Sequence, residues 1–298
     1  MKNTNLQQTV GSLFQQALEK KMTSDLSKKH KDNLRHLYNH FMLFLGPEGR
    51  EISLQELSTP QIEAFLHRYN SSGTNYMNKR RDLSVLFNTA ARLIDESLLT
   101  IKRTELRKIK AKLNLAYEKE QLKPILSFIK VNHTNLYRCC LMTYGCFLRP
   151  HEEIRLLTKK HFKAGNSEIH LAGDENKGGK VRVVYVPDYV REELEPVLDG
   201  IKREDNIFSL CKIPFNETYF SKQWSRQKKA LLSYGLIYPN QTLYSFRHSA
   251  AIDVFRRTKD VYLVQKMMGH SSVTVTLKYL RSLGEFNTDE LREAAPTL

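Results

Sequence analysis

The hydrophobic pattern of the first hundred residues predicts amphipathic helices. In the segment 23–46 the side chains of one face recur at three- and four-residue spacing: Leu26, His30, Leu34, Leu37, Phe41 and Phe44. Gly46 is placed to end that helix. A shorter helix is expected over 58–70, with Pro60 in its first turn, and a long one from Thr74 that buries Leu83, Leu86, Phe87 and Ala90.

The pattern changes in the second half of the chain. Helical segments are predicted at about 120–130 and 134–148, followed by two alternating stretches, SEIHLAG and GGKVRVVYVP, that are typical of strands. The turn DENKGG lies between these strands, and helical spacing returns after Pro187. The fold class is therefore predicted to be mainly α, with an N-terminal helical domain and a C-terminal α+β domain that contains a small antiparallel sheet.

The length of 298 residues favours two domains. Residues 101–120 are rich in Lys and Arg and poor in turn residues, and no Gly/Ser linker marks the junction. We predict a helical domain over 1–105, a linker over 106–118 and a second domain over 119–298.

Composition indicates the kind of cellular compartment in which the protein functions. The chain has no run of eighteen apolar residues, and its first residues lack the apolar stretch of a secretory leader. Its four cysteines fit no zinc spacing, and Cys139 and Cys140 lie in a segment that we interpret as a buried helix. These features favour a reducing, cytoplasmic setting without a membrane span.

The charge distribution favours a polyanionic partner. The net charge is +15, and both halves share it: residues 1–110 hold 18 Lys and Arg against 11 Asp and Glu, and the rest hold 29 against 21. Nucleic acid is the first candidate and an anionic membrane surface the second, although a merely basic protein is also compatible with the count. Lys79, Arg80 and Arg81, near the start of one predicted helix, form either a solvated charge cluster or a DNA-binding face.

Several polar residues interrupt apolar surroundings in the second half. In order, they are Arg149 with Glu152 three residues later, Lys177 in the predicted turn, Tyr244 with Arg247 and His248, His270 after a glycine, and Tyr279 nine residues further on. Each residue alone has a structural explanation, such as a helix-end arginine or a packed tyrosine. Their order and spacing together need another one.

That order resembles the tyrosine recombinase (phage integrase) family over residues 119–284, and the helical first hundred residues resemble the core-binding domain of the family more loosely. The resemblance implies that Tyr279 is a nucleophile toward a DNA phosphate. It implies that Arg149 and Arg247 clamp the phosphate oxygens, that Lys177 protonates the leaving 5′-oxygen and that His270 hydrogen-bonds the phosphate. Glu152 is the expected supporting acid. Guanidinium groups suit this chemistry because they remain charged and donate in a planar, bidentate manner.

One position departs from the family pattern. The family usually has a histidine three residues before the second arginine, where this chain has Tyr244. A phenol can donate a hydrogen bond to phosphate but is a poor base near neutral pH. The proton acceptor for Tyr279 therefore stays open; the adjacent His248 is more often a packing residue in the family.

The resemblance implies site-specific DNA recombination through a covalent 3′-phosphotyrosine, in integration, inversion or excision, by a simple two-domain protein of prokaryotic or phage origin. It implies no cofactor and no metal. The partners would be double-stranded DNA sites and three further copies of the chain in a tetrameric synapse. A short helical patch around residues 288–294 is a candidate contact between copies. The alternatives are type IB topoisomerase activity, a non-catalytic DNA-binding protein on the same scaffold and a basic chromatin-like protein.

Overall fold

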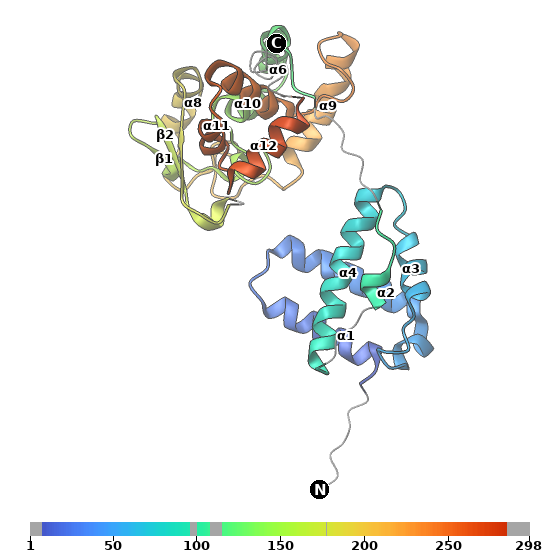
Figure 1. Cartoon of the computed structure of the whole chain (residues 1–298). Helices are drawn as coiled ribbons and strands as arrows, with labels where there is room; N and C mark the ends of the chain where they lie inside the picture. Colours follow the sequence, from blue (N-terminus) through green and yellow to red (C-terminus); the bar gives the residue numbers. More distant parts are fainter. Residues whose placement is uncertain (1–7, 96–99, 108–114, 177, 285–298) are drawn as a thin grey trace, which may run out of the picture. The chain divides into compact units, whose positions relative to one another are not determined.

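The chain folds into two compact units, residues 1–110 and 111–298 (Figure 1). The structure is a computed structural model that describes residues 8–95, 100–107, 115–176 and 178–284. The division falls within the predicted linker, but the end of that linker is packed. Tyr117 is buried, its backbone N–H donates to Ser249 Oγ at 2.7 Å and its hydroxyl to the Thr242 carbonyl at 2.7 Å. Tyr117 therefore belongs to the second unit.

The first unit is helical, as predicted. Its elements are α1 (Val10–Thr23), α2 (Lys28–Glu51), α3 (Thr59–His67), α4 (Gly73–Leu93) and α5 (Thr100–Arg103). Helices α1, α2 and α4 pack together around aromatic side chains: Phe14 lies edge-on to Phe87 at 4.8 Å between ring centroids and 5.3 Å from Phe41. Burying such rings supplies much of the stability of a small helical core.

Helix α2 is bent at the residue where the sequence predicts its end. Gly46 has a φ of +68°, a left-handed conformation that favours glycine, and Pro47 follows it. Helical structure resumes after this kink and continues to Glu51. The helix therefore ends later than expected because Pro47 can begin a new helical turn.

The second unit contains helices around a small sheet. Its helices are α6 (Lys119–Asn132), α7 (Thr134–Gly145), α8 (Asp188–Gly200), α9 (Tyr219–Ser233), α10 (Ser245–Thr258), α11 (Val261–Met268) and α12 (Val273–Ser282), with short 3-10 turns η1 (Ile154–Leu156), η2 (Lys159–His161) and η3 (Gly173–Glu175). The strands are β1 (Phe162–Lys163), β2 (Glu168–Leu171) and β3 (Arg182–Tyr185), antiparallel in the order β1-β2-β3. The predicted fold class is confirmed, with β1 as an additional strand.

Two apolar clusters hold the second unit together. Helix α7 lies in the larger one, packed against α6, α8, α9 and α10, and buries Cys139 and Cys140 as predicted. A smaller cluster joins α10, α11 and α12 through Ala251, Val264 and Leu280. The helices that carry Arg247 and Tyr279, and the helix α11 that ends just before His270, therefore share one small core.

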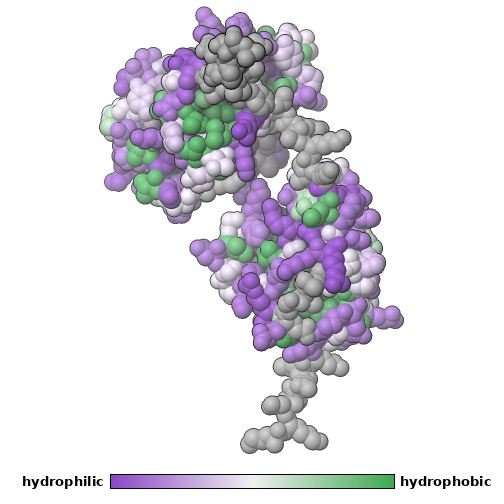
Figure 2. All heavy atoms as spheres, viewed as in Figure 1, coloured by the Kyte–Doolittle hydropathy of each residue, from purple (hydrophilic) through white to green (hydrophobic). Residues whose placement is uncertain are grey.

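The visible surface is mainly hydrophilic in both units, with smaller apolar areas (Figure 2). No helix in the part of the chain that the structure describes is long and apolar enough to cross a bilayer.

Candidate active site

Arg247 is the buried centre of a polar cluster in the second unit. It lies in the first turn of α10 and is 0 % exposed. Its Nη2 donates to the Met268 carbonyl at 2.6 Å, whereas Nε and Nη1 are buried and have no hydrogen-bond partner among the residues that the structure describes. Burial lowers the pKa of Arg247 to about 10, so the group stays charged at neutral pH. Since a buried unpaired donor is costly, these two N–H groups are suited to an anion.

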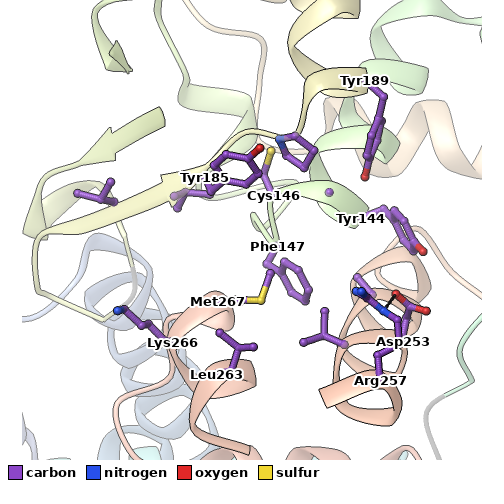
Figure 3. Close-up of a pocket in the computed structure, with 16 residues that line it drawn as sticks. Tyr144, Cys146, Phe147, Tyr185, Tyr189, Asp253, Arg257, Leu263, Lys266 and Met267 are labelled. Carbon is purple, nitrogen blue, oxygen red and sulfur yellow. Dashed lines mark hydrogen bonds and ion pairs between the residues drawn. The ribbon is translucent and has the colours of Figure 1, made fainter. Parts of the chain in front are cut away.

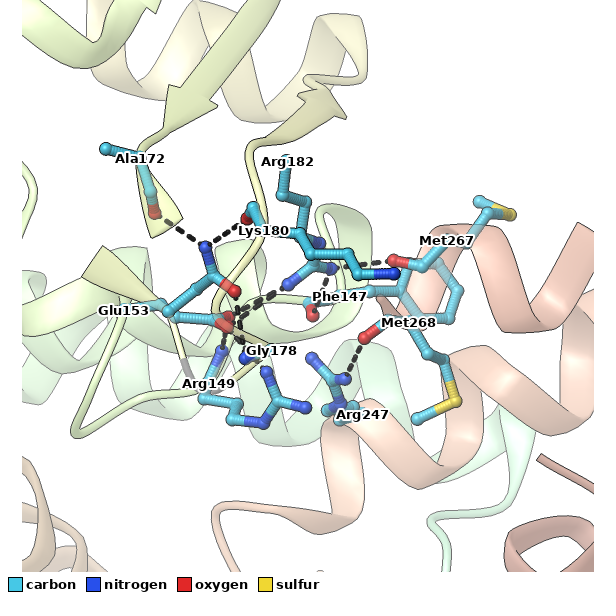
Figure 4. Close-up of polar contacts among 11 residues, drawn as sticks. Phe147, Arg149, Glu153, Ala172, Gly178, Lys180, Arg182, Arg247, Met267 and Met268 are labelled. Carbon is cyan, nitrogen blue, oxygen red and sulfur yellow. Dashed lines mark hydrogen bonds and ion pairs between the residues drawn. The ribbon is translucent and has the colours of Figure 1, made fainter. Parts of the chain in front are cut away.

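Arg149 and Arg182 share one buried carboxylate, that of Glu153. The backbone N–H of Arg149 donates to Glu153 Oε2 at 2.8 Å and its Nη1 to Oε1 at 2.5 Å. Nη1 of Arg182 donates to the same two oxygens at 3.1 and 3.2 Å (Figure 4). The expectation that Glu152 supports the site is therefore corrected. Glu152 is exposed, whereas Glu153, the residue after it, is directed inward by the turn that follows Pro150.

Arg182 connects the sheet to the rest of the cluster through hydrogen bonds. It lies in β3 and is 9 % exposed, and its Nη2 donates to the carbonyls of Phe147 at 3.2 Å and Met267 at 2.7 Å. Arg182 was not among the site residues predicted from the sequence, where GGKVRVVYVP was interpreted only as a strand. In β3, Arg182 and Val184 are buried, whereas Val183 and Tyr185 are exposed. The local signal for Arg182 is a charge within an apolar run.

A glycine allows the close approach of Arg182 to α11. Gly269 ends α11 in the left-handed conformation with a φ of +62°. A Cβ at this position would lie 2.7 Å from Arg182 Nε. The Gly-His pair of the sequence therefore has two physical reasons for its glycine, and it brings the next residue, His270, to the cluster.

His270 lies next to Tyr279 and is held by a threonine. Its Nδ1 is 3.0 Å from the hydroxyl oxygen of the fully buried Thr276, and its ring centroid is 5.4 Å from that of Tyr279. Burial, and then the charges of Arg247, Arg149 and Arg182, together lower the pKa of His270 to about 4. The imidazole is therefore neutral near pH 7, and when Thr276 donates to Nδ1, the Nε2–H is available as a donor.

The hydroxyl of Tyr279, in α12, contacts His248, in α10. The hydroxyl oxygen lies 2.6 Å from His248 Nδ1. Burial raises the pKa of Tyr279, whereas Arg247 lowers it and Tyr244 raises it. The phenol is therefore protonated at neutral pH in the absence of a partner that takes its proton.

Tyr244 completes this group at the N-cap position of α10. Its ring lies edge-on to His248, with 5.1 Å between the centroids, and the Arg247 guanidinium carbon is 5.9 Å from its centroid. The structure thus brings together Arg149, Tyr244, Arg247, His248, His270 and Tyr279.

Lys177 lies outside the described residues. The turn around it is held by Asn176, whose Nδ2 donates to the carbonyls of Ala172 at 2.7 Å and Lys180 at 2.8 Å. Lys180 is exposed in the same turn, and Figure 4 shows its side chain beside the Arg182 side chain, directed toward Met267. Lys180, which was not predicted from the sequence, is thus a second candidate for the lysine role.

The basic residues of α4 divide into different roles. Arg80 donates through Nε to Thr104 Oγ1 at 2.8 Å and through Nη2 to the carbonyls of Ile101 and Lys102. The expectation that Arg80 binds DNA is corrected, because its guanidinium stabilises the end of α5. Lys79 lies over the Tyr69 ring, and Arg81 is exposed beside Asp82, so these two stay candidates for DNA contact.

A cavity of about 540 Å³ lies behind the cluster, between α7, β3, α10 and α11 (Figure 3). Phe147 and Met267, whose carbonyls accept from Arg182, line it, and an ion pair between Arg257 and Asp253 at 3.1 Å lies on its wall. The predicted catalytic residues that the structure describes are not among its lining residues.

Comparison with known proteins gives related recombinases. The chain is 29% identical to tyrosine recombinase XerC of Rhodospirillum centenum over 142 residues, which cover 46% of this chain and 40% of that protein. It is 26% identical to tyrosine recombinase XerA of Thermococcus kodakarensis (58% and 60% covered) and 24% identical to XerA of Saccharolobus solfataricus (80% and 77% covered). The match therefore spans about half the length of the first two relatives.

Solved structures share the fold at low sequence identity. A lambda integrase tetramer bound to a Holliday junction has a TM-score of 0.75 at 15% identity, with 95% of this chain and 80% of that chain covered. The Tn1549 transposon integrase bound to transposon right end DNA has a TM-score of 0.71 at 17% identity, with 97% and 100% covered. A sequence profile of the phage integrase family matches residues 116–285, more than half of the chain and the whole span of the cluster. The protein therefore belongs to the phage integrase family.

Proposed function

We propose that the protein is a site-specific DNA recombinase that cleaves and rejoins DNA strands through a phosphotyrosine at Tyr279. The observation that carries this proposal is Arg247, a fully buried guanidinium with two unpaired donors in the same cluster as the Tyr279 hydroxyl. An anion that binds these donors lies within the positive field of Arg247 and Arg149, which also favours the ionised phenol. A DNA phosphate fits both requirements.

The charges of the cluster suit phosphoryl transfer. Attack by a tyrosine on a phosphodiester increases the negative charge on the non-bridging oxygens, and fixed donors stabilise that charge most when they are already oriented. Glu153 holds Arg149 and Arg182, and the Met268 carbonyl holds Arg247, so these guanidinium groups are positioned without the substrate. His270 would add a neutral donor to the phosphate, and a lysine of the 174–180 turn would protonate the leaving 5′-oxygen.

A nicked suicide DNA substrate tests the proposal directly. Cleavage of such a substrate releases a short fragment and traps the protein as a covalent adduct that survives SDS. We expect an adduct on a DNA site that the protein binds specifically, followed by rejoining to a second strand. Failure to form any adduct on a specifically bound site would favour the non-catalytic DNA-binding alternative, and adducts on DNA of any sequence together with relaxation of supercoils would favour a topoisomerase.

The first prediction concerns cofactors. We expect cleavage and rejoining to proceed at the same rate in EDTA without any nucleotide, because Arg149 and Arg247 supply the positive charge at the phosphate and the phosphotyrosine conserves the energy of the broken bond. Single-turnover cleavage with and without EDTA measures this. A strict requirement for a divalent ion in the cleavage step would overturn the proposed mechanism.

The second prediction concerns Tyr244, which lies beside Arg247 and His248. If its hydroxyl donates to the phosphate, Tyr244→Phe removes a hydrogen bond to a charged group worth roughly 1.5–3 kcal/mol, so the cleavage rate should fall about ten- to a hundredfold. Tyr244→His should keep activity. A Phe variant that cleaves at the unaltered rate from pH 6 to pH 9 would assign Tyr244 to packing alone.

The third prediction concerns assembly on DNA. The predicted helical patch at 288–294 lies outside the described residues. We propose that it contacts a second copy of the chain in a tetramer that joins two DNA sites. Truncation after Gly284 should then leave binding to a single site unchanged and weaken the cooperative pairing of two sites in a gel-shift assay. Recombination at the unaltered rate by the truncated chain would contradict this role.

A further inference from the structure

We propose that His248 takes the proton from Tyr279 during DNA cleavage and returns it during rejoining. This inference rests on the proposed function, and it assigns the proton acceptor that the sequence analysis left open. The geometry is direct, because Nδ1 of His248 lies 2.6 Å from the Tyr279 hydroxyl oxygen, within the range in which a general base removes a proton.

His270 and Tyr244 also lie near the Tyr279 phenol, but they are less suited to accept its proton. His270 lies beside the Tyr279 ring, with an angle of 70° between the ring planes, and its Nδ1 is occupied by Thr276 at 3.0 Å. Tyr244 carries a phenol, which is a poor base near neutral pH, and its ring lies against His248. Among the residues that the structure describes, His248 is the titratable group with a recorded hydrogen bond to the Tyr279 hydroxyl.

The protonation state of His248 agrees with this role. Burial, and then the charge of Arg247, lower the pKa of His248 to about 4, so the ring is neutral at pH 7. With the ring proton on Nε2, the lone pair of Nδ1 accepts the hydrogen bond from the Tyr279 O–H. Because the phenol is the donor in this bond, the lone pairs of its oxygen remain available for attack on phosphorus.

Burial and, to a lesser extent, the charge of Arg247 make His248 a weak base in the free protein. A phosphate against the unpaired donors of Arg247 offsets that charge, which raises the basicity of the imidazole. The phenol becomes more acidic as its oxygen bonds to phosphorus, so the transfer is favoured in the transition state. The Arg247 guanidinium thus lowers the basicity of His248 in the free protein, and the bound phosphate offsets this effect.

In the proposed step one bond to phosphorus forms as another breaks, and every proton that moves has a donor and an acceptor. The bond between Tyr279 Oη and phosphorus forms as the bond between phosphorus and O5′ breaks. The proton of Oη moves to Nδ1 of His248, which becomes an imidazolium, and O5′ receives a different proton from the lysine of the 174–180 turn. In rejoining, the 5′-hydroxyl attacks phosphorus and gives its proton back to the lysine, as the bond between phosphorus and Tyr279 Oη breaks and that oxygen recovers its proton from His248.

The test separates proton removal from protonation of the leaving group. His248→Asn keeps an acceptor close to the position of Nδ1 but cannot take a proton. We expect single-turnover cleavage of a suicide substrate to fall about 10²- to 10⁴-fold, the usual contribution of a general base, with unchanged DNA binding. On a substrate with sulfur in place of O5′, which leaves without a proton, the His248→Asn defect should persist. The matched variants Lys177→Ala and Lys180→Ala show which lysine defect the sulfur corrects.

A second variant distinguishes loss of the base from loss of folding. Thiazolylalanine at position 248 keeps the ring and an acceptor nitrogen in the place of Nδ1, but that nitrogen is far less basic than imidazole. It should show the same loss of cleavage on both substrates with an unchanged melting temperature. Cleavage at the unaltered rate by either variant, or full recovery of both on the sulfur substrate, would overturn the role of His248. If the unaltered chain forms no adduct, the proposed function fails instead.

Discussion

Tyr279→Phe is expected to abolish the covalent adduct while binding to the DNA site is nearly unchanged. In the proposed mechanism the hydroxyl is the nucleophile of the chemical step, and among the residues that the structure describes it makes one hydrogen bond, to His248 Nδ1. Losing one such bond costs roughly 0.5–1.5 kcal/mol of stability, which leaves the fold intact. SDS gels of a radiolabelled suicide substrate measure the adduct, and fluorescence anisotropy measures binding.

The control for this experiment is Tyr262→Phe. Tyr262 lies in the neighbouring helix α11, its side chain is exposed, and it has no contact with the cluster among those described. We expect it to form the adduct at the unaltered rate. An SDS-resistant complex with the Tyr279→Phe chain would mean that the nucleophile is another residue.

Glu153→Gln is expected to lower the free energy of unfolding by about 3 kcal/mol and to reduce cleavage. Glu153 is fully buried as a side chain and bridges Arg149 and Arg182. Breaking a buried ion pair from one side typically costs 3–5 kcal/mol because a charge is left without its partner. The lower end applies here because the Arg149 side chain keeps 17% of its surface exposed and retains contact with water.

Glu152→Gln is the matched control, since it makes the same chemical change one residue away on an exposed side chain. Its effect on unfolding should stay within about 0.5 kcal/mol. Denaturant unfolding of both variants, followed by single-turnover cleavage, distinguishes the two positions. Equal stability of the two variants would contradict the role given to Glu153, and a cleavage defect in the Glu152 variant would restore the original assignment.

The pair Glu152 and Glu153 illustrates a general limit of sequence reasoning. Both acids are glutamates, and they follow Arg149 at nearly the same spacing. Depending on whether the chain continued as a helix or in an extended form, either carboxylate could point inward. The chain turns at Pro150 and enters η1, with the backbone N–H of Glu153 bonded to the Arg149 carbonyl. The direction of that turn decides which carboxylate is buried.

Arg80 and Arg182 show the same limit for basic residues. A lysine and two arginines in a row on a helix predict an exposed basic face, but α5 returns to α4 and its carbonyls take up the donors of Arg80. Arg182 lies in a mostly apolar strand, and its inward position depends on an acid, Glu153, 29 residues earlier in the chain. Partners this distant in sequence leave no local pattern.

The sequence by itself determined the classes of the elements, the mainly helical fold with a small antiparallel sheet, and the residues of the cluster around Arg149, Arg247, His270 and Tyr279. It could do so because apolar periodicity and the order of chemically unusual residues are local properties of the chain. The tertiary structure alone decided which acid holds the arginines, that Arg80 and Arg182 bind carbonyls and side chains of the protein itself, and that His248 rather than Tyr244 contacts the Tyr279 hydroxyl. These depend on contacts of α4 with α5, of α10 with α12, and of β3 with the residues before η1, which the chain brings together only when its apolar faces are buried.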